Sequence, residues 1–293
     1  MKQKRGWFCV ILLALAPFFL IAKPAMAAEK PLIFGVFPYL SGYSVVSKFA
    51  DLRDYLAAEL KRPVQVYTAP DFRTFIERTQ RGDYDIALTA PHLARLAILE
   101  ANYAPLATYK STLQTLIVAK KDGPFTRLAD LRGKSIAIPD RLAIVTMLGT
   151  QLLREAGLRD VQDYTLVATL SHSSAALSVQ RGQHDAAIIG SNPFSQLTQD
   201  AQAGLRILAS SAPIPTQYYI AHKRLGSRQI TRLQSLLITF AENTPSGQKF
   251  IEENHVLGIE AASGDELKQM DDSVNQVKRL LKKNGRPNPT DPK

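Results

Sequence analysis

The stretch QRGDYDIA at residues 80–87 recurs one hundred positions later as QRGQHDAA at residues 180–187. Both copies read Gln-Arg-Gly-x-x-Asp-x-Ala, and each follows a helical pattern and leads into a short apolar run. Glycine adopts the left-handed backbone that ends a helix, and a short polar Asp suits the turn before a strand. A proline of the kind that opens helices follows each copy, Pro91 or Pro193. The repeat therefore predicts two similar α/β lobes, and coincidence between two ordinary turns is the alternative.

Apolar runs alternate with amphipathic stretches on both sides of each copy. The run LIFGVF at 32–37 is continuous, as is typical of a buried parallel strand, and apolar residues then recur at helical spacing over 46–60. Residues 103–109 are interpreted as a connection. This alternation predicts an α/β fold with mostly parallel sheets flanked by helices. Two such lobes leave a cleft between them, where a ligand would lie beside strand ends and favour hinge closure.

Two polar or proline-rich segments indicate where the chain crosses between the lobes. They are KKDGP at 120–124 and PIP at 213–215. The predicted lobe one comprises residues 28–120 and 214–283, and the predicted lobe two comprises residues 121–213. Residues 284–293 are polar and proline-rich, which predicts a disordered tail.

The first 27 residues have the pattern of a secretory signal peptide. Basic residues at the start precede an apolar segment at 7–22 and a small-x-small site, AMA, at 25–27. A retained membrane anchor is the alternative. Cleavage would remove Cys9, the only cysteine, so the mature chain would have no disulfide and no cysteine nucleophile. We therefore expect a periplasmic protein.

The charge of the chain is mildly basic. Removing the four basic residues of the leader lowers the formal net charge from +10 to +6. No dense Lys/Arg run is interleaved with aromatic residues, so nucleic acid is not expected as a partner. A basic surface does attract anionic solutes over a distance.

Several motifs together resemble those of a known family. They are GVFPY at 35–39, DLRDYL at 51–56, the first repeat, LADLRGK at 128–134 and SHSSAA at 171–176. Over roughly residues 32–250 the chain resembles the phosphate/phosphite/phosphonate-type solute-binding proteins of ABC transporters. The resemblance implies a two-lobed type II periplasmic-binding fold, a small anionic solute, an ABC permease as partner and no enzymatic activity. A module that presents a solute to a membrane sensor kinase is the alternative.

The chain departs from this family at one position that matters for the ligand. Phosphonate-binding members have Ser-Thr-Ser-Gly at the start of the first long helix of lobe two, where hydroxyls and backbone N–H groups hold the oxyanion. The corresponding stretch here is AIVT at 143–146. A helix N-terminus can still bind an anion through its backbone N–H groups. We therefore expect simple phosphonates to bind less tightly than the family pattern implies.

Candidate ligand-binding residues follow predicted strands or open predicted helices. We expect contributions from Tyr39, Ser41, Thr89, His92, Arg141, Thr146, His172, Asn192 and Tyr218. Each has a structural alternative, such as a loop position, a solvated arginine or packing in the hinge. His172 matches the family position and is the strongest candidate in lobe two.

No cofactor or metal is expected from the sequence. The five histidines are scattered without a His-x-x-x-His pair, and there is no Gly-x-Ser-x-Gly elbow or glycine-rich phosphate loop.

Overall fold

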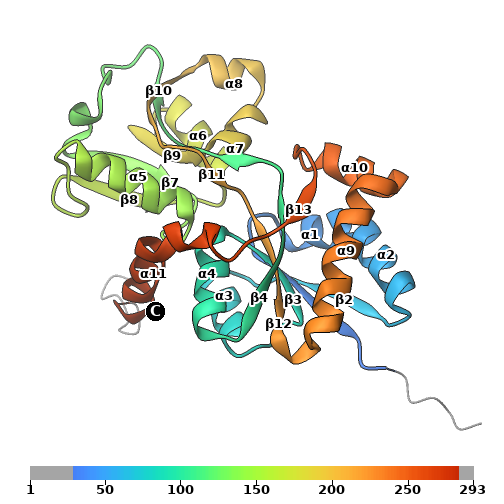
Figure 1. Ribbon diagram of the computed structural model, residues 1–293. Coiled ribbons are helices and arrows are strands. Elements are labelled where there is room, and N and C mark those ends of the chain that lie inside the picture. Colours follow the sequence, from blue (N-terminus) through green and yellow to red (C-terminus); the bar gives the residue numbers. More distant parts are fainter. Residues whose placement is uncertain (1–28, 284–293) are drawn as a thin grey trace, which may run out of the picture.

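The computed structural model describes residues 29–283, and it has two lobes, each built on one central β-sheet (Figure 1). The predicted signal peptide and the predicted C-terminal tail lie outside the described residues. Within residues 29–283, none of the helices combines the length and the apolar character that crossing a membrane requires.

Lobe one is formed around a six-stranded sheet in the order β13-β4-β12-β3-β1-β2. The strands, in chain order, are β1 (Leu32–Val36), β2 (Val64–Tyr67), β3 (Ile86–Thr89), β4 (Tyr103–Tyr109), β12 (Tyr218–His222) and β13 (Ile259–Ala261). Its helices are α1 (Gly42–Lys48), α2 (Ala50–Leu60), α3 (Phe72–Gln80), α4 (Pro91–Glu100), α9 (Ser227–Asn243) and α10 (Pro245–Glu253). The C-terminal helix α11 (Asp271–Lys283) packs on α4 and also contacts lobe two.

Lobe two is formed around a five-stranded sheet in the order β10-β6-β9-β7-β8. The strands are β6 (Thr115–Lys120), β7 (Lys134–Ile138), β8 (Tyr164–Ala168), β9 (Ala186–Gly190) and β10 (Leu205–Ser210). The helices are α5 (Ile144–Glu155), α6 (His172–Gln180), α7 (Ser191–Ser195) and α8 (Gln199–Ala203). Short 3-10 helices occur at Leu128–Leu131, Lys223–Leu225 and Glu266–Met270.

The repeated motif ends a helix in the same way in both lobes. Gly82 and Gly182 have φ angles of +74° and +70°, in the left-handed region. In each lobe the N–H of this glycine and the N–H of the next residue donate to carbonyls in the last turn of α3 or α6. This is the Schellman arrangement, which satisfies carbonyls that a helix end otherwise leaves unpaired. The predicted helix stops are therefore confirmed.

The repeated aspartate connects the turn to the neighbouring strand. The Asp85 carboxylate accepts a hydrogen bond from the N–H of Ile33 on β1 at 2.8 Å, and the Asp185 carboxylate accepts one from the N–H of Ser135 on β7 at 2.9 Å. Each aspartate therefore satisfies a backbone donor at the start of a parallel strand pair. This shared role explains why the motif occurs once in each lobe.

The first crossing between the lobes lies earlier than the sequence predicted. β6 pairs with β9 and β10 in the second sheet, so the predicted end of lobe one at residue 120 is wrong and the chain leaves lobe one after Tyr109. The return segment, residues 211–217, overlaps the predicted PIP crossing. The two crossing segments pair as short antiparallel strands, β5 (Thr112–Leu113) and β11 (Ile214–Pro215). A polar turn at 120–124 looked like a linker, but it only joins β6 to the rest of lobe two.

The sheets contain more antiparallel pairing than the sequence predicted. β1 pairs in parallel with β2 and β3, and β7 pairs in parallel with β8 and β9, but every pairing of β4, β6, β10, β12 and β13 is antiparallel. Four of these strands, β4, β6, β10 and β12, adjoin the crossings, where the chain returns through a sheet in the opposite direction. Residues 103–109, predicted as a connection, form β4 in the interior of the first sheet, between β12 and β13.

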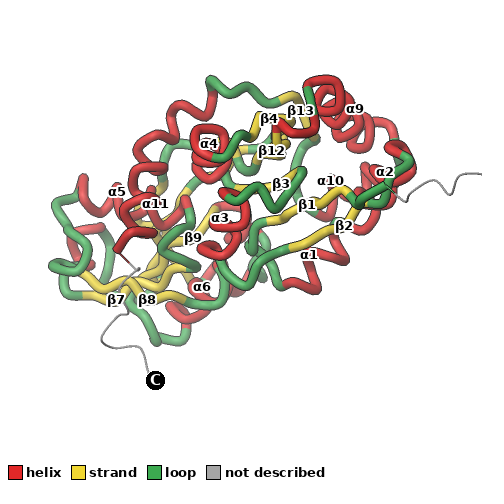
Figure 2. Tube along the Cα trace, turned by 90° about the horizontal axis from the view of Figure 1, so that it is seen from below, coloured by secondary structure: helices red, strands yellow, loops and turns green. Residues whose placement is uncertain are grey.

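Hydrophobic residues form a core on each face of both sheets. In lobe one, α3 and α4 cover one face, while α1, α2, α9 and α10 cover the other. The first of these cores continues into lobe two, because residues 142–145 and Met147 at the start of α5 pack within it. Figure 2 shows α5, α11 and α4 gathered on the same side of the molecule. The start of α5 is thereby held against lobe one, at the junction of the lobes.

Candidate functional site

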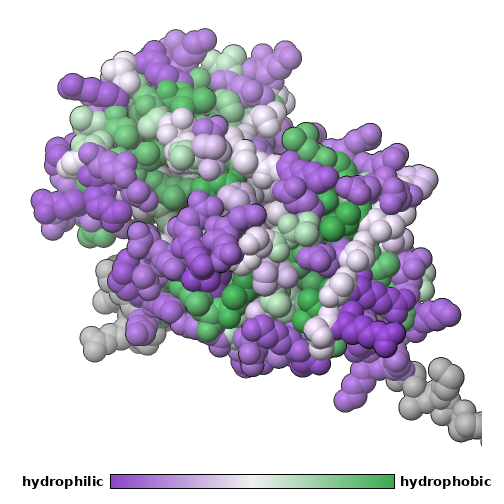
Figure 3. Space-filling model, viewed as in Figure 1, coloured by the Kyte–Doolittle hydropathy of each residue, from purple (hydrophilic) through white to green (hydrophobic). Residues whose placement is uncertain are grey.

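A pocket of about 260 Å³ lies between the two lobes and the crossing segments. Much of its wall is apolar, with residues from lobe one, from the crossings and from lobe two, including Phe37, Phe72, Leu113, Pro139, Ile144 and Val145. In the space-filling view, the outer rims of both lobes are largely hydrophilic, and apolar patches lie on the face of each lobe (Figure 3). The pocket lies beyond the ends of β1, β8 and β9, as expected for open α/β sheets.

Tyr39, one of the predicted residues, lines the pocket from lobe one. It follows β1, and its ring stacks on Phe37 with centroids 4.7 Å apart. The hydroxyl is buried and has no hydrogen-bond partner within the described residues. Burial raises the pKa of Tyr39 above its usual range, so the hydroxyl stays protonated and can donate. A buried donor without a partner is costly, and a bound acceptor would remove that cost.

His172 and Asn192, also predicted, line the pocket from lobe two. The N–H of Gly190 donates to Nδ1 of His172 at 3.1 Å, which makes Nδ1 an acceptor and places the ring proton on Nε2. Burial lowers the pKa of His172 to about 4, so the ring is neutral at pH 7. No partner for Nε2 is present in the described part of the chain. His172 therefore presents a neutral N–H donor.

Sequence reasoning missed several polar residues of the pocket. Lys48, the last residue of α1, is the only charged side chain among the lining residues, and its Nζ donates to the carbonyl of Glu253 at 3.1 Å. Burial lowers the pKa of Lys48, and the Glu253 carboxylate partly offsets this. Thr216 lies on the return crossing, and its buried hydroxyl has no partner within residues 29–283. In the sequence, the only indication of Thr216 was its position next to the PIP segment, and no pattern indicated Lys48.

Two long helices begin at the pocket without a capping side chain. Ala90 precedes α4 in lobe one and Ala143 precedes α5 in lobe two, both line the pocket, and neither makes a side-chain cap hydrogen bond. The first N–H groups of a helix have no partner within the helix, and the helix dipole makes this end positive. Pro91 has no N–H group, and the N–H groups of Leu93 and Thr146 donate to the carbonyls of Ala90 and Ala143. The amides that remain without a partner within residues 29–283 are those of His92 in α4 and of Ile144 and Val145 in α5. The two helix starts can therefore stabilise an anion from the two lobes.

Three predicted residues lie elsewhere in lobe one, outside the pocket lining. The Ser41 hydroxyl accepts from the N–H of Ser44 and caps α1, so it is used locally. Thr89 is fully buried at the end of β3, and Tyr218 is fully buried on β12, where its hydroxyl donates to Glu266 at 3.1 Å. The two residues pair directly across β3 and β12, so their side chains lie on the same face of the sheet, and neither lines the pocket.

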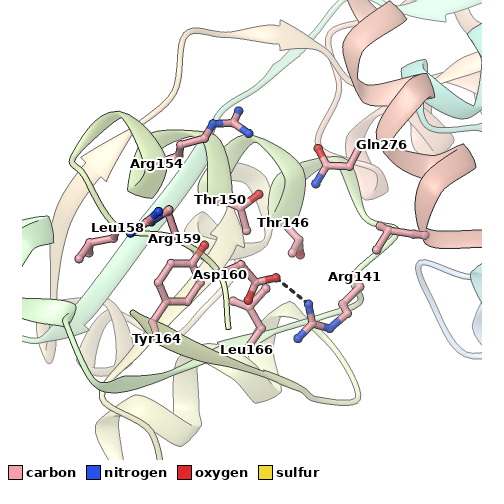
Figure 4. Close-up of a pocket in the computed structure, with 11 residues that line it drawn as sticks. Arg141, Thr146, Thr150, Arg154, Leu158, Arg159, Asp160, Tyr164, Leu166 and Gln276 are labelled. Atoms are coloured by element: carbon pink, nitrogen blue, oxygen red, sulfur yellow. Dashed lines mark hydrogen bonds and ion pairs between the residues drawn. The ribbon is translucent and has the colours of Figure 1, made fainter. Parts of the chain in front are cut away.

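The other three predicted residues surround the start of α5. His92 is fully buried, and its Nε2 donates to the carbonyl of Leu142 at 2.9 Å, so it joins α4 to lobe two beside the pocket. Arg141 pairs with Asp160 at 3.0 Å, and both Arg141 and Thr146 line a different pocket on another face of α5 (Figure 4). The structure thus brings only Tyr39, His172 and Asn192 together among the nine candidates.

The arrangement is suited to holding a ligand. The residues lining the interlobe pocket supply one cation, several neutral donors and two helix N-termini, but no carboxylate. Among the described residues, no group of three or more His, Cys, Asp or Glu side chains is placed to hold a metal ion. An anion is therefore the ligand that this pocket favours electrostatically.

The sequence matches the model of one protein family over most of the chain. Residues 34–267 match the family described as "ABC transporter, phosphonate, periplasmic substrate-binding protein".

Solved structures with the same fold include three whose ligands or roles are named. PhnD1 from Prochlorococcus marinus, in complex with methylphosphonate, has a TM-score of 0.76 and 13% identity, with 85% of this chain and 99% of that chain covered. A binding protein component of an ABC phosphonate transporter from Pseudomonas aeruginosa has a TM-score of 0.71 and 16% identity, covering 88% and 100%. The periplasmic aliphatic sulphonate binding protein SsuA from Escherichia coli has a TM-score of 0.61 and 18% identity, covering 86% and 94%. At these identities the likeness establishes the two-lobed type II periplasmic-binding fold.

Proposed function

The chain belongs to the family of periplasmic substrate-binding proteins of ABC phosphonate transporters, and from this premise we propose that its interlobe pocket binds a small organic oxyanion for delivery to an ABC permease. We further propose that the leader at 1–27 directs export to the periplasm and that the protein binds its solute without chemical turnover. The observation that carries the proposal is the pair of uncapped helix starts, at Ala90 and Ala143, that line one pocket from opposite lobes.

The donors around the pocket fit a phosphonate or sulfonate head group. Tyr39, Thr216 and His172 each have a polar atom without a partner in the described residues, and Lys48 supplies positive charge. Hydrogen bonds to a charged acceptor contribute about 1.5–3 kcal/mol each. The helix start at Ala143 replaces hydroxyls with backbone N–H groups only, so fewer donors reach the head group than in the family pattern.

The apolar wall predicts an apolar substituent on the solute. The volume of about 260 Å³ equals roughly eight or nine water volumes, which is more than a head group alone occupies. Side chains such as Phe72 and Ile144 offer no hydrogen bonds to a polar substituent. The absence of a carboxylate among the lining residues leaves an ammonium group on the solute without a counter-charge. We therefore infer an alkyl or aryl oxyanion rather than an aminoalkyl one.

Calorimetric titration of the mature protein with a series of alkylphosphonates and alkylsulfonates tests this function. Each added CH₂ should tighten binding about fourfold until the pocket is full, from about 0.8 kcal/mol of burial. Propylphosphonate should bind more tightly than 2-aminoethylphosphonate, which has the same size but carries an ammonium group. Failure of every member to bind, or tighter binding of inorganic phosphate than of any alkylphosphonate, would contradict the proposal.

Matched variants locate the binding in this pocket. Tyr39→Phe and Thr216→Val each remove one hydroxyl and should weaken binding about tenfold or more. Tyr43→Phe removes a hydroxyl from a side chain that is 86% exposed and outside the pocket, and it should bind as the wild type does. If Tyr39→Phe and Thr216→Val bind the solute as tightly as Tyr43→Phe does, the solute binds elsewhere.

A further inference from the structure

A second pocket, of about 240 Å³, lies on a different face of α5 from the interlobe pocket. Its walls come from Arg141 and α5, from the segment that follows α5 and from β8, and from two residues of the C-terminal helix α11, Gln276 and Leu280 (Figure 4). Thr146, Thr150 and Arg154 lie one helical turn apart along the same side of α5, which the 3.6-residue repeat places in one row. We refer to this site as the arginine pocket.

Positive charge exceeds negative charge in the arginine pocket. Arg141, Arg154 and Arg159 line it, and Asp160 is the only acidic lining residue. Asp160 pairs with Arg141 at 3.0 Å, whereas Arg154 makes no ion pair with any residue that the structure describes. Arg159 approaches Asp163 only at 3.9 Å, and that carboxylate is already hydrogen-bonded to Arg132. Two guanidinium groups are therefore available to a ligand.

Uncharged polar groups point into the same space. Thr146 is 2% exposed, and its hydroxyl has no hydrogen-bond partner among residues 29–283. In Figure 4 the amide of Gln276 reaches from α11 toward Thr146 and Thr150, and the Tyr164 hydroxyl lies near Arg159 and Asp160. A buried hydroxyl without a partner is unfavourable, so Thr146 marks a place where an acceptor is missing.

We propose that the arginine pocket is a second ligand site and that it binds an organic phosphate. It is separate from the interlobe pocket, which we call the solute pocket from here on. The planar guanidinium group of arginine matches the geometry of phosphate oxygens. The unpaired guanidinium of Arg154, together with that of Arg159, whose ion pair with Asp163 is long, can balance the double negative charge of a phosphate monoester. The apolar side chains of Leu158, Leu166 and Leu280, with the ring of Tyr164, provide a surface for an organic substituent. A ligand here touches α5 of lobe two and also α11, which packs on α4 of lobe one.

Phenyl phosphate is a suitable probe, because it carries the phosphate and a flat apolar group. Phenyl phosphate is also an aryl oxyanion of the class proposed for the interlobe pocket. Calorimetry is therefore run in saturating propylsulfonate, which occupies the interlobe pocket and, as a monoanion, competes less well for the arginine pocket. Binding of phenyl phosphate to the mature wild type should persist under these conditions. The double variant Arg154→Gln with Arg159→Gln should raise the dissociation constant at least about tenfold. The control Arg181→Gln with Arg228→Gln removes the same charge from exposed positions outside the pocket and should leave the constant unchanged. Added salt should weaken the binding, because both guanidinium groups are exposed.

His172→Ala separates this site from the solute pocket. It should leave unchanged the phenyl phosphate binding that persists in saturating propylsulfonate, while it weakens binding of the alkylphosphonates. Three results, all measured in saturating propylsulfonate, would overturn the proposal: no binding of phenyl phosphate to the wild type below about 10 mM, equal binding by the arginine double variant, or loss of binding in His172→Ala. Circular dichroism of each variant confirms that the fold is retained before its affinity is compared.

Discussion

Lowering the pH from 7 to 5 should destabilise the folded protein by about 2 kcal/mol through a single side chain, His92. This side chain is fully buried on α4, and its Nε2 donates to the carbonyl of Leu142 in lobe two at 2.9 Å. Its Nδ1 has no hydrogen-bond partner within the described residues, so an added proton would have no acceptor. Burial lowers the pKa of His92 to about 4.

The direction of the effect follows from the two pKa values. In the unfolded chain the His92 pKa is about 6.5, so the unfolded chain binds a proton at a higher pH than the folded protein does. The contribution of neutral His92 to the free energy of unfolding is therefore fully present above about pH 6.5 and is lost as the pH falls toward 4. A difference of about 2.5 pKa units corresponds to a limit of about 3.4 kcal/mol, of which about 2 kcal/mol is reached at pH 5.

Urea unfolding followed by circular dichroism, at pH 7, 6 and 5, measures this contribution. His92→Gln is the comparison, because its amide can still donate to Leu142 but does not titrate. The stability difference between wild type and variant should change by about 2 kcal/mol between pH 7 and pH 5. Parallel pH profiles would refute the reasoning. If the variant does not fold, the ring resonances of His92 in the wild type provide the test, since titration of the ring near pH 6.5 would contradict a buried neutral histidine.

Three further predictions concern export, packing and motion. The exported protein should begin at Ala28 or Glu29, and N-terminal sequencing that finds the leader retained would contradict the signal-peptide interpretation. Gly149→Ala should destabilise the protein by about 1–3 kcal/mol in urea unfolding, because its Cβ would lie 2.5 Å from Cγ2 of Ile188 and push α5 away from the sheet. Saturation with a tightly bound alkylphosphonate should favour lobe closure about the crossings at 110–114 and 211–217, and an unchanged radius of gyration in small-angle scattering would count against a hinge.

The local signals in the sequence predicted the lobes well. The repeated Gly-x-x-Asp unit marks two helix stops, and the structure shows that Asp85 and Asp185 hold equivalent strands. Helix stops and turns depend on interactions between residues close in the chain, so the residues themselves carry the information.

Pairings between distant segments were less predictable. The strand β4 lacks a distinctive pattern, and it pairs with β12 and β13, which follow it by more than one hundred residues. The same holds for β6, which looked like the end of lobe one but pairs with β9 and β10. Which sheet a strand joins depends on non-local packing, and no short stretch of sequence encodes it.

The site shows the same division between local and tertiary information. The sequence by itself identified the family, the two-lobed fold and the strand ends that carry Tyr39 and His172, because these follow from patterns along the chain. Only the tertiary structure showed that Lys48 and Thr216 reach the solute pocket. It also showed that Thr146 and Ile144 face different pockets, because residues two positions apart on a helix point about 200° apart around its axis. One therefore lines the solute pocket and the other the arginine pocket, because the direction of a side chain is set by how the whole helix packs.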